Sequence, residues 1–268
     1  MKKIFFVAVS LFVLAGCTGA SSGYKAPMPE SLAIVAGSGG VNTPISGGNK
    51  PLALIYKGLG SCSADQGDAG TPAYGCSEAS SDAAVKAGFD YLFVGPNDSP
   101  DFSKAAVWIQ PGGNSDAANA AMSSKLKNDL IQYVSNGGGY VGICAGAFLA
   151  ADWFHIFPGT ADLYTYNAIQ SNVDYAFLKI NWSGTERYIY FEGGPYFHNL
   201  GSSVEVMATF DDTGDVAAAR ATYGKGRVYV SGAHPEAPAL WSSEDGNTDP
   251  DGSDISLAAG MISWAGHR

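Results

Sequence analysis

The sequence is poor in basic residues. Its 268 residues include 15 Lys and Arg against 25 Asp and Glu, which gives a formal net charge of -10 at pH 7. No basic stripe or arginine cluster follows the first few residues, and nucleic-acid binding is not expected, because it depends on concentrated positive charge. The acidity itself is typical of a soluble domain and identifies no substrate.

Long hydrophobic runs are also missing. The apolar run at residues 4–15 is too short to span a bilayer. It follows a basic Met-Lys-Lys start and ends in Leu-Ala-Gly before Cys17, an order that resembles a bacterial lipoprotein signal. The resemblance implies a signal peptide at residues 1–17, with Cys17 as the lipidated residue; an ordinary secretory signal cut nearby is the alternative. Both predict export. Because Thr18 and not aspartate follows, we expect the periplasmic face of the outer membrane if the source is Gram-negative.

A tether and one folded domain are predicted after the signal. Residues 18–50 are rich in Gly, Ser, Pro and Asn without a sustained hydrophobic period, and such a composition buries too little surface to fold by itself. Residues 51–268 form the expected domain, which is long enough for a full hydrophobic core.

Cysteines are few, and one of them occupies a distinctive motif. Residues 142–146 read Gly-Ile-Cys-Ala-Gly, after an apolar strand and before a helix of small residues. This is the pattern of a nucleophile elbow with Cys144 in the serine position, where Gly142 and Gly146 permit a sharp turn and close approach of strand and helix. A helix N-terminus also favours the thiolate. The alternative is a small, buried and inert cysteine.

A candidate base follows about ninety residues later. Residues 226–230 have the composition of a strand, and His234 and Glu236 lie just beyond it. A cysteine nucleophile needs a base within hydrogen-bond reach and a third group that orients the base. The sequence therefore predicts a Cys144-His234-Glu236 triad, against the alternative of a structural histidine.

Together these motifs resemble the cysteine triad of the class I glutamine amidotransferase-like superfamily. Residues 107–113 resemble that superfamily's strand ending in a Pro-Gly-Gly loop, and residues 189–197 are similar to the domain at the N-terminus of large biotin–protein ligases, which also occurs as free-standing proteins. The likeness covers roughly residue 51 to the C-terminus. It implies an α/β fold: a flavodoxin-like three-layer sandwich with a mainly parallel central sheet and a β-rich excursion between nucleophile and base.

The resemblance also implies a chemistry. Cys144 would form a thioester with a small-molecule or peptide amide, as in an amidase or glutaminase-like hydrolase, without a cofactor or metal. The implied oxyanion donors are Ala145, Gly112 and Gly113, and the implied substrate rim consists of Gly193, Gly194 and Tyr196. No ammonia-accepting domain follows the triad, and nothing resembles the Gly-Arg-Gly-rich loop of a biotin ligase, so biotin transfer is not expected. The alternatives are a lipoprotein that binds a ligand or envelope partner without turnover, and a redox-reactive Cys144.

The hydrophobic pattern agrees with an α/β domain. Short apolar strands are expected at 52–56, 91–94, 106–110 and 140–143, with helices at 77–87 and 117–135. The second half has strand patterns at 177–180, 188–191, 204–210, 217–223 and 227–230, and a terminal helix at 255–264. This order predicts one domain with a parallel sheet and an excursion.

Two other clusters have weaker patterns. Cys62 and Cys76 lie in a Ser/Gly/Asp-rich segment at the carboxyl edge of the sheet, and in an oxidising compartment they are expected to form a disulfide contributing roughly 2–3 kcal/mol; a zinc or redox pair of free thiols is the alternative. Residues 247–252 resemble the opening of a calcium loop, but Ala258 stands where a glutamate is needed. A solvated acidic turn is therefore expected there.

Overall fold

The computed structural model describes residues 50–62, 74–165, 175–244, 246 and 248–266. The predicted signal peptide with Cys17 and residues 18–49 of the predicted tether fall outside these residues. Within the described residues, no helix combines the length and apolar character needed to cross a membrane.

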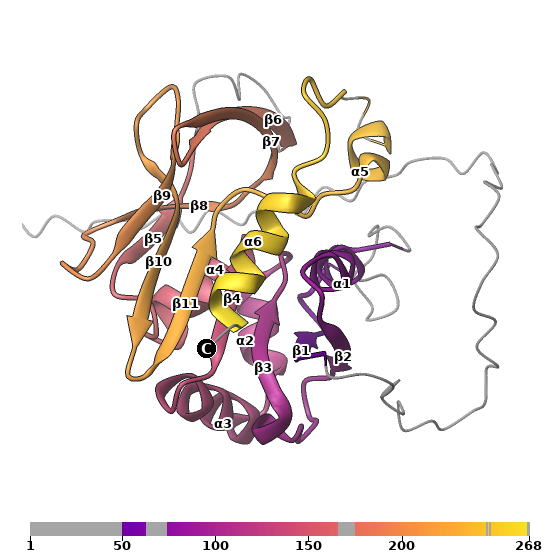
Figure 1. Ribbon diagram of the computed structural model, residues 1–268, viewed down its shortest axis with the longest axis vertical. Coiled ribbons are helices and arrows are strands. Elements are labelled where there is room, and N and C mark those ends of the chain that lie inside the picture. Colours follow the sequence, from indigo (N-terminus) through magenta and orange to yellow (C-terminus); the bar gives the residue numbers. More distant parts are fainter. Residues whose placement is uncertain (1–49, 63–73, 166–174, 245, 247, 267–268) are drawn as a thin grey trace, which may run out of the picture. The chain divides into compact units, whose positions relative to one another are not determined.

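A parallel sheet forms the first half of the fold and receives one late strand (Figure 1). Its strands run in the order β2-β1-β3-β4-β11, and all four pairings are parallel. The strands are β1 (Leu52–Tyr56), β2 (Asp90–Val94), β3 (Ala105–Gln110), β4 (Gly139–Ile143) and β11 (Gly226–Ser231). Each lies within about two residues of a strand expected from the sequence, because short apolar runs are typical of strands buried on both faces.

Antiparallel strands continue the sheet beyond β11 in the order β10-β9-β6-β7, with β5 and β8 attached at the side of β10. They are β5 (Thr160–Leu163), β6 (Tyr175–Trp182), β7 (Thr185–Glu192), β8 (Pro195–His198), β9 (Glu205–Phe210) and β10 (Val216–Tyr223). All of them lie between β4 and β11 in the sequence, so the chain is a mixed α/β domain with an antiparallel excursion, as expected. The short strands β5 and β8 were not predicted.

Helices cover both faces of the parallel strands. On one face α1 (Cys76–Lys86) lies beside α6 (Ile255–Gly266) (Figure 1), and their alanines pack on Ala53, Ile55 and Val107. The other face carries α2 (Ser115–Ala121), α3 (Ser124–Ser135) and α4 (Ala145–Phe148), packed on Leu54 and Trp108. The remaining elements are the 3-10 helix η2 (Phe102–Lys104), the π-helix η3 (Leu149–Trp153), which continues α4, and α5 (Ala239–Glu244).

One predicted helix is wrong in its extent. The expected helix at 117–135 is two helices, because the chain leaves the helical conformation at Met122 and Ser123. The Ser123 side chain accepts a hydrogen bond from Leu126 N at 3.2 Å and so caps α3, while Ser123 N donates to Pro96 O at 2.9 Å. A serine cap of this kind starts a new helix where the hydrophobic stripe alone suggests continuity.

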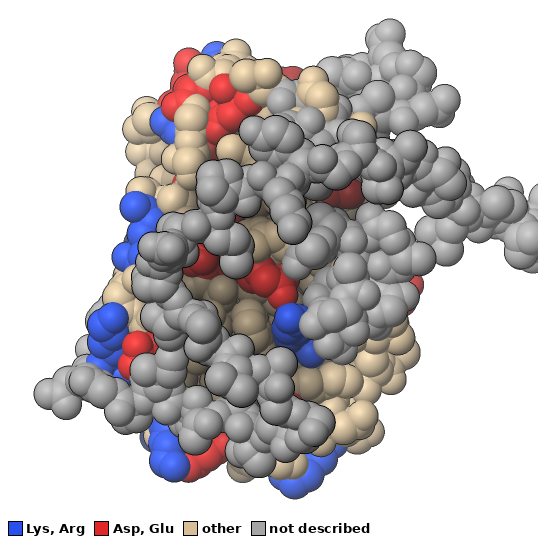
Figure 2. Space-filling model, turned by 90° about the vertical axis from the view of Figure 1, so that its right-hand side faces the viewer, with Lys and Arg blue, Asp and Glu red and all other residues tan. Residues whose placement is uncertain are grey.

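Charges are dispersed on the described surface. On the face drawn in Figure 2, the visible Lys and Arg side chains are interspersed with Asp and Glu. Several charged residues of the described part of the chain form ion pairs, including Arg220 with Glu205 at 2.7 Å and Lys57 with Glu78 at 2.7 Å.

Candidate active site

The nucleophile candidate lies in a tight turn between β4 and α4. Cys144 has a φ of 50°, which is unusual for a residue with a side chain and costs on the order of 1–3 kcal/mol. Its N–H donates to Ser231 O at 2.8 Å, so the turn is bonded to the end of the neighbouring strand β11. The backbone thus fixes Cys144 beside the strand that leads to His234.

The two glycines of the motif make this turn possible. A Cβ on Gly142 would lie 2.4 Å from Gly146 O, and a Cβ on Gly146 would lie 2.1 Å from Gln110 O. No larger residue fits either position without a shift of backbone. Tyr140 Oη donates to Gly146 O at 2.7 Å and joins strand and helix further. The close approach expected from the sequence is therefore present.

The predicted base and orienting group are in contact. His234 Nδ1 lies 2.9 Å from Glu236 Oε1, and both residues are buried. The backbone N–H of His234 donates to Tyr190 O at 2.8 Å. Its ring packs edge-on against Tyr190 at 6.0 Å and Trp241 at 5.8 Å, measured between ring centroids. Neither aromatic residue was predicted from the sequence to contact His234.

Electrostatics couple the histidine to both partners. Burial by itself lowers the pKa of the His234 imidazole. The opposing effects are larger: they come from the charges of the Glu236 carboxylate and the Cys144 thiolate and from hydrogen bonds to both side chains. The pKa of His234 therefore stands well above its usual value. The imidazolium is therefore the favoured form. Glu236 Oε2 is buried without a hydrogen-bond partner among the described residues, which leaves the imidazolium as the main stabiliser of this carboxylate.

The thiol lies under a loop of the excursion. Cys144 Sγ donates to Glu192 O at 3.5 Å, and the residue is only 4% exposed. Gly193, with a φ of 58°, follows on the exposed side. Of the other predicted rim residues, Gly194 packs against the backbone of Gly232. The Tyr196 ring packs against Tyr164 and His198.

The two glycines of the predicted oxyanion loop have different neighbours. A Cβ on Gly112 would lie 2.5 Å from His234 Cε1 and 3.4 Å from Cys144 Cβ, so this glycine borders the candidate site directly. A Cβ on Gly113 would instead meet Gly60 O at 2.4 Å and Cys62 N at 2.8 Å. Gly113 therefore faces the turn after β1. Ala145 begins α4, where the first N–H groups have no partner within the helix.

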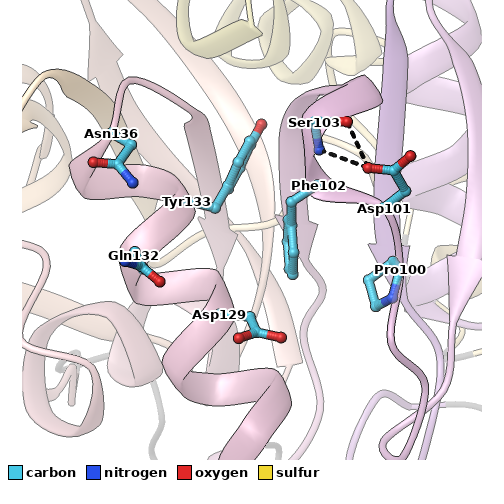
Figure 3. Close-up of a pocket in the computed structure, with 8 residues that line it drawn as sticks. All are labelled: Pro100, Asp101, Phe102, Ser103, Asp129, Gln132, Tyr133 and Asn136. Atoms are coloured by element: carbon cyan, nitrogen blue, oxygen red, sulfur yellow. Dashed lines mark hydrogen bonds between the residues drawn. The ribbon is translucent and has the colours of Figure 1, made fainter.

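A cavity of about 160 Å³ reaches His234. Its wall contains apolar side chains and two carboxylates. The lining residues include Phe177, Tyr190, Ala237, Pro238, Asp249 and Asp254. A larger groove of about 510 Å³ lies elsewhere, between η2 and α3 (Figure 3), with Phe102 and Tyr133 on its two sides. No predicted site residue lines that groove.

The predicted disulfide is not formed. Cys62 and Cys76 are free thiols, although they are in contact: Cys76 N donates to Cys62 O at 3.3 Å, and their side chains share a hydrogen bond. They lie close to the candidate site, because a Cβ on Gly112 would come within 3.3 Å of Cys76 Sγ.

The acidic turn near the C-terminus forms ion pairs with Arg187. Arg187 Nε lies 3.4 Å from Asp251 Oδ2 and donates to Asp254 Oδ1 at 2.8 Å. Asn247, the first residue of the calcium-like pattern, falls outside the described residues. Among the described residues no group of three or more His, Cys, Asp or Glu is arranged to hold a metal ion.

Two family models match the sequence. Residues 1–18 match the prokaryotic membrane lipoprotein lipid attachment site, which confirms the predicted lipid anchor and places the chain at the bacterial cell envelope. Residues 97–164 match the family described as "Biotin-protein ligase, N terminal", which confirms the predicted resemblance there. This match includes Cys144 and Gly112 and ends before His234.

Known proteins support the same fold. The chain is 26% identical over 167 residues to a biotin–protein ligase of Schizosaccharomyces pombe; the match covers 51% of this chain but only 26% of the ligase, about a quarter of its length. The structure of PurLQS from Thermotoga maritima aligns with 78% of this chain and 97% of its own, with 17% identity and a TM-score of 0.55. A protein described as a GMP synthase subunit from Thermoplasma acidophilum aligns with 81% of this chain and 96% of its own, with 14% identity and a TM-score of 0.51. These likenesses establish the glutamine amidotransferase-like fold and no activity.

Proposed function

We propose that this lipid-anchored protein with a glutamine amidotransferase-like fold is a cysteine-dependent amidohydrolase or amidotransferase-like enzyme of the cell envelope. One observation carries the proposal: Cys144 occupies a strained turn at the end of β4, next to a buried His234 that bonds Glu236 and is electrostatically coupled to the thiol. Strained backbone and a perturbed titratable group together are typical of catalytic sites.

The proposed reaction begins from an ion pair in which His234, oriented by Glu236 through Nδ1, already holds the proton of the Cys144 thiol. The thiolate then attacks the carbonyl carbon of an amide, and the imidazolium returns the proton to the leaving amine. A thioester on Cys144 remains. Water, activated by the neutral His234, hydrolyses this thioester to the acid and restores the thiol; an acceptor amine in place of water would give acyl transfer.

The oxyanion of the tetrahedral intermediate needs donors beside the thiol. We assign this role to the N–H groups of Ala145, at the start of α4, and of Gly112, which borders both Cys144 and His234. Gly113 is the weaker candidate because it packs against the turn at residues 60–62. Its contribution is to hold the loop that carries Gly112.

The proposed substrate is a small-molecule or peptide amide. The cavity at His234 has the size of a small group and is lined by apolar and acidic side chains. Gly193 is exposed and follows Glu192, whose carbonyl contacts the thiol, so we assign it to the substrate border. Gly194 and Tyr196 support that border through their packing.

We propose the domain organisation that the sequence predicts. Residues 1–17 are the signal peptide with its lipobox, residues 18–50 are a tether and residues 51–268 are the domain. We also infer a flavodoxin-like three-layer core, since the order β2-β1-β3-β4-β11 has the pattern 2-1-3-4-5 of flavodoxin-like sheets.

Activity-based labelling tests the proposal. The folded protein is treated with electrophilic analogues of glutamine and of small peptide amides, and the modified residue is identified by mass spectrometry. We expect labelling at Cys144 that is lost in Cys144→Ala and reduced at least about 100-fold in His234→Ala. The analogue that reacts fastest indicates the substrate class. Labelling of Cys144 that is equally fast without His234 would contradict the triad.

The burial of Cys144 favours one rival function, a lipoprotein that binds a ligand or envelope partner without turnover. The two functions differ in product. Release of ammonia or amine from envelope amides supports the enzyme, whereas a ligand that protects Cys144 from alkylation and is recovered unchanged supports the binding protein.

A further inference from the structure

Two cysteines outside the proposed triad lie against it. Cys62 ends the turn after β1 and Cys76 is the first residue of α1. Their backbones are in close contact, since a Cβ on Gly75 would lie 1.8 Å from Cys62 O, and Cys76 N donates to this same carbonyl. The two sulfur atoms therefore remain together whenever α1 and the turn are in place.

The two thiols differ in character. Cys76 is 3% exposed; burial, together with the hydrogen bond to Cys62, raises the pKa of its thiol. Cys62 is half-buried, and the hydrogen bond that it accepts from Cys76 lowers the pKa of its own thiol. A half-buried thiol of lowered pKa beside a buried thiol is an arrangement suited to thiol–disulfide exchange.

The pair is linked to the candidate active site through one glycine. Around the Cα of Gly112 lie Cys76 Sγ, Cys144 Cβ and His234 Cε1, at 3.3, 3.4 and 2.5 Å from the position of an added Cβ. The charge of a Cys62 thiolate also interacts with His234. A Cys62 thiolate would therefore compete with the Cys144 thiolate for the same imidazolium.

We propose that Cys62 and Cys76 are a redox-active pair whose oxidation to a disulfide increases the reactivity of Cys144. When Cys62 is ionised, the reduced pair carries a negative charge next to the loop that borders His234, and the disulfide carries none. Like charge disfavours a second thiolate nearby, so loss of the Cys62 charge leaves the imidazolium to Cys144 and Glu236. The oxidising envelope would then hold the protein in its more reactive form.

The oxidation step balances with a small disulfide as the oxidant. The Cys62 thiolate attacks one sulfur of glutathione disulfide, forms a mixed disulfide and releases one glutathione thiolate. Cys76 then passes its proton to the departing thiolate and attacks Cys62 Sγ, which expels the second glutathione. Two electrons pass from the pair to the small disulfide, and one glutathione thiol and one glutathione thiolate leave.

The first experiment measures the pair itself. The full-length protein in detergent is equilibrated in buffers of increasing glutathione disulfide to glutathione ratio, quenched in acid, alkylated and analysed by mass spectrometry. We expect a Cys62–Cys76 cross-linked peptide that appears and disappears reversibly with the ratio. A cross-link that never forms, or one that persists in excess reduced glutathione, would overturn the proposal.

The second experiment measures the link to the nucleophile. After equilibration and removal of the small thiols, the rate of iodoacetamide labelling at Cys144 is compared between the two states. We expect labelling about fivefold faster in the oxidised state, from the removal of one nearby charge. In Cys62→Ser, the cross-link is lost and Cys144 is labelled at the fast rate in both buffers. Equal rates in both states of the unmodified protein, or a redox dependence that survives in Cys62→Ser, would overturn the link.

These outcomes are separable from the proposed function. A redox-dependent labelling rate without hydrolysis of any amide supports the pair and contradicts the enzyme. Amide hydrolysis that is insensitive to the state of the pair supports the enzyme and contradicts the link.

Discussion

Cys144 and His234 lie at the ends of neighbouring parallel strands, yet the chain holds them in different ways. Cys144 is fixed by local backbone: two glycines, a positive φ and a hydrogen bond to Ser231. His234 is fixed by distant residues, through the backbone of Tyr190 and the ring of Trp241. The position of Cys144, which we call the nucleophile side, therefore depends on two glycines that have no side chain. The position of His234, which we call the base side, depends on contacts with residues far away in the sequence. The first kind of support should be intolerant of any substitution, and the second should be graded.

The largest effect is expected from Gly146→Ala. The new methyl group would lie 2.1 Å from Gln110 O, so strand and helix must separate. We expect the free energy of unfolding to fall by about 3 kcal/mol, measured by urea denaturation. Gly260→Ala is the matched control, because a Cβ at this exposed position in α6 meets no atom within 4 Å; it should stabilise the protein by about 0.5–1 kcal/mol. Equal stability of the two variants would refute the local account of Cys144.

A smaller effect is expected from Glu236→Gln on the base side. Glutamine keeps the size of the side chain but removes the charge that raises the pKa of His234. The pKa of His234 should then fall, so the imidazolium that supports the Cys144 thiolate is lost at a lower pH than in the unmodified protein. We expect the rate of Cys144 alkylation at neutral pH to fall about 10- to 100-fold.

The control for this variant is Glu205→Gln, which removes a carboxylate paired with Arg220 on the surface. Its alkylation profile against pH should match that of the unmodified protein. A Glu236→Gln profile that also matches would show that the carboxylate does not act through His234.

The smallest effect concerns the pH dependence of stability, which we expect to arise near His234. Burial raises the pKa of Asp254, in the wall of the cavity at His234, to about 6. The folded state therefore binds this proton more tightly than the unfolded state, and the stabilisation is fully present below about pH 4 and lost as the pH rises through about 6. We expect Asp254 to contribute about 1–2 kcal/mol more at pH 5 than at pH 7.5.

Urea denaturation of the unmodified protein and of Asp254→Asn at both pH values measures this term. Asparagine can still accept the hydrogen bond from Arg187 but binds no proton, so the difference between the two pH values should shrink by that amount. An unchanged difference would assign the pH dependence to other groups.

The contrast between local and distant support also explains which features can be predicted from the sequence. The parallel strands follow from short apolar runs, and the position of Cys144 follows from two glycines with exact spacing, because both are local signals. The contact between His234 and Glu236 follows from their separation of two residues. Their role in catalysis stays a prediction.

Other features depend on partners that are distant in the sequence, and no local sequence pattern indicates them. Ser123 reads as part of a continuous helix until Pro96 accepts its N–H. Tyr190 and Trp241 have no sequence spacing that relates them to His234, and only the fold brings them to its ring. The difference between the predicted disulfide and the observed pair of free thiols, Cys62 and Cys76, lies in their oxidation state, which composition does not encode.

The bond between Cys144 and Ser231 has a consequence for how such proteins diversify. The bond keeps Cys144 and the end of β11 at one edge of the sheet. The antiparallel insert re-enters the sheet at Gly226, at the opposite end of β11, and carries Tyr190, whose carbonyl holds the backbone of His234. An exchanged insert must therefore supply the same support for the imidazole, whereas the turn that holds the sulfur depends on β4, α4 and β11.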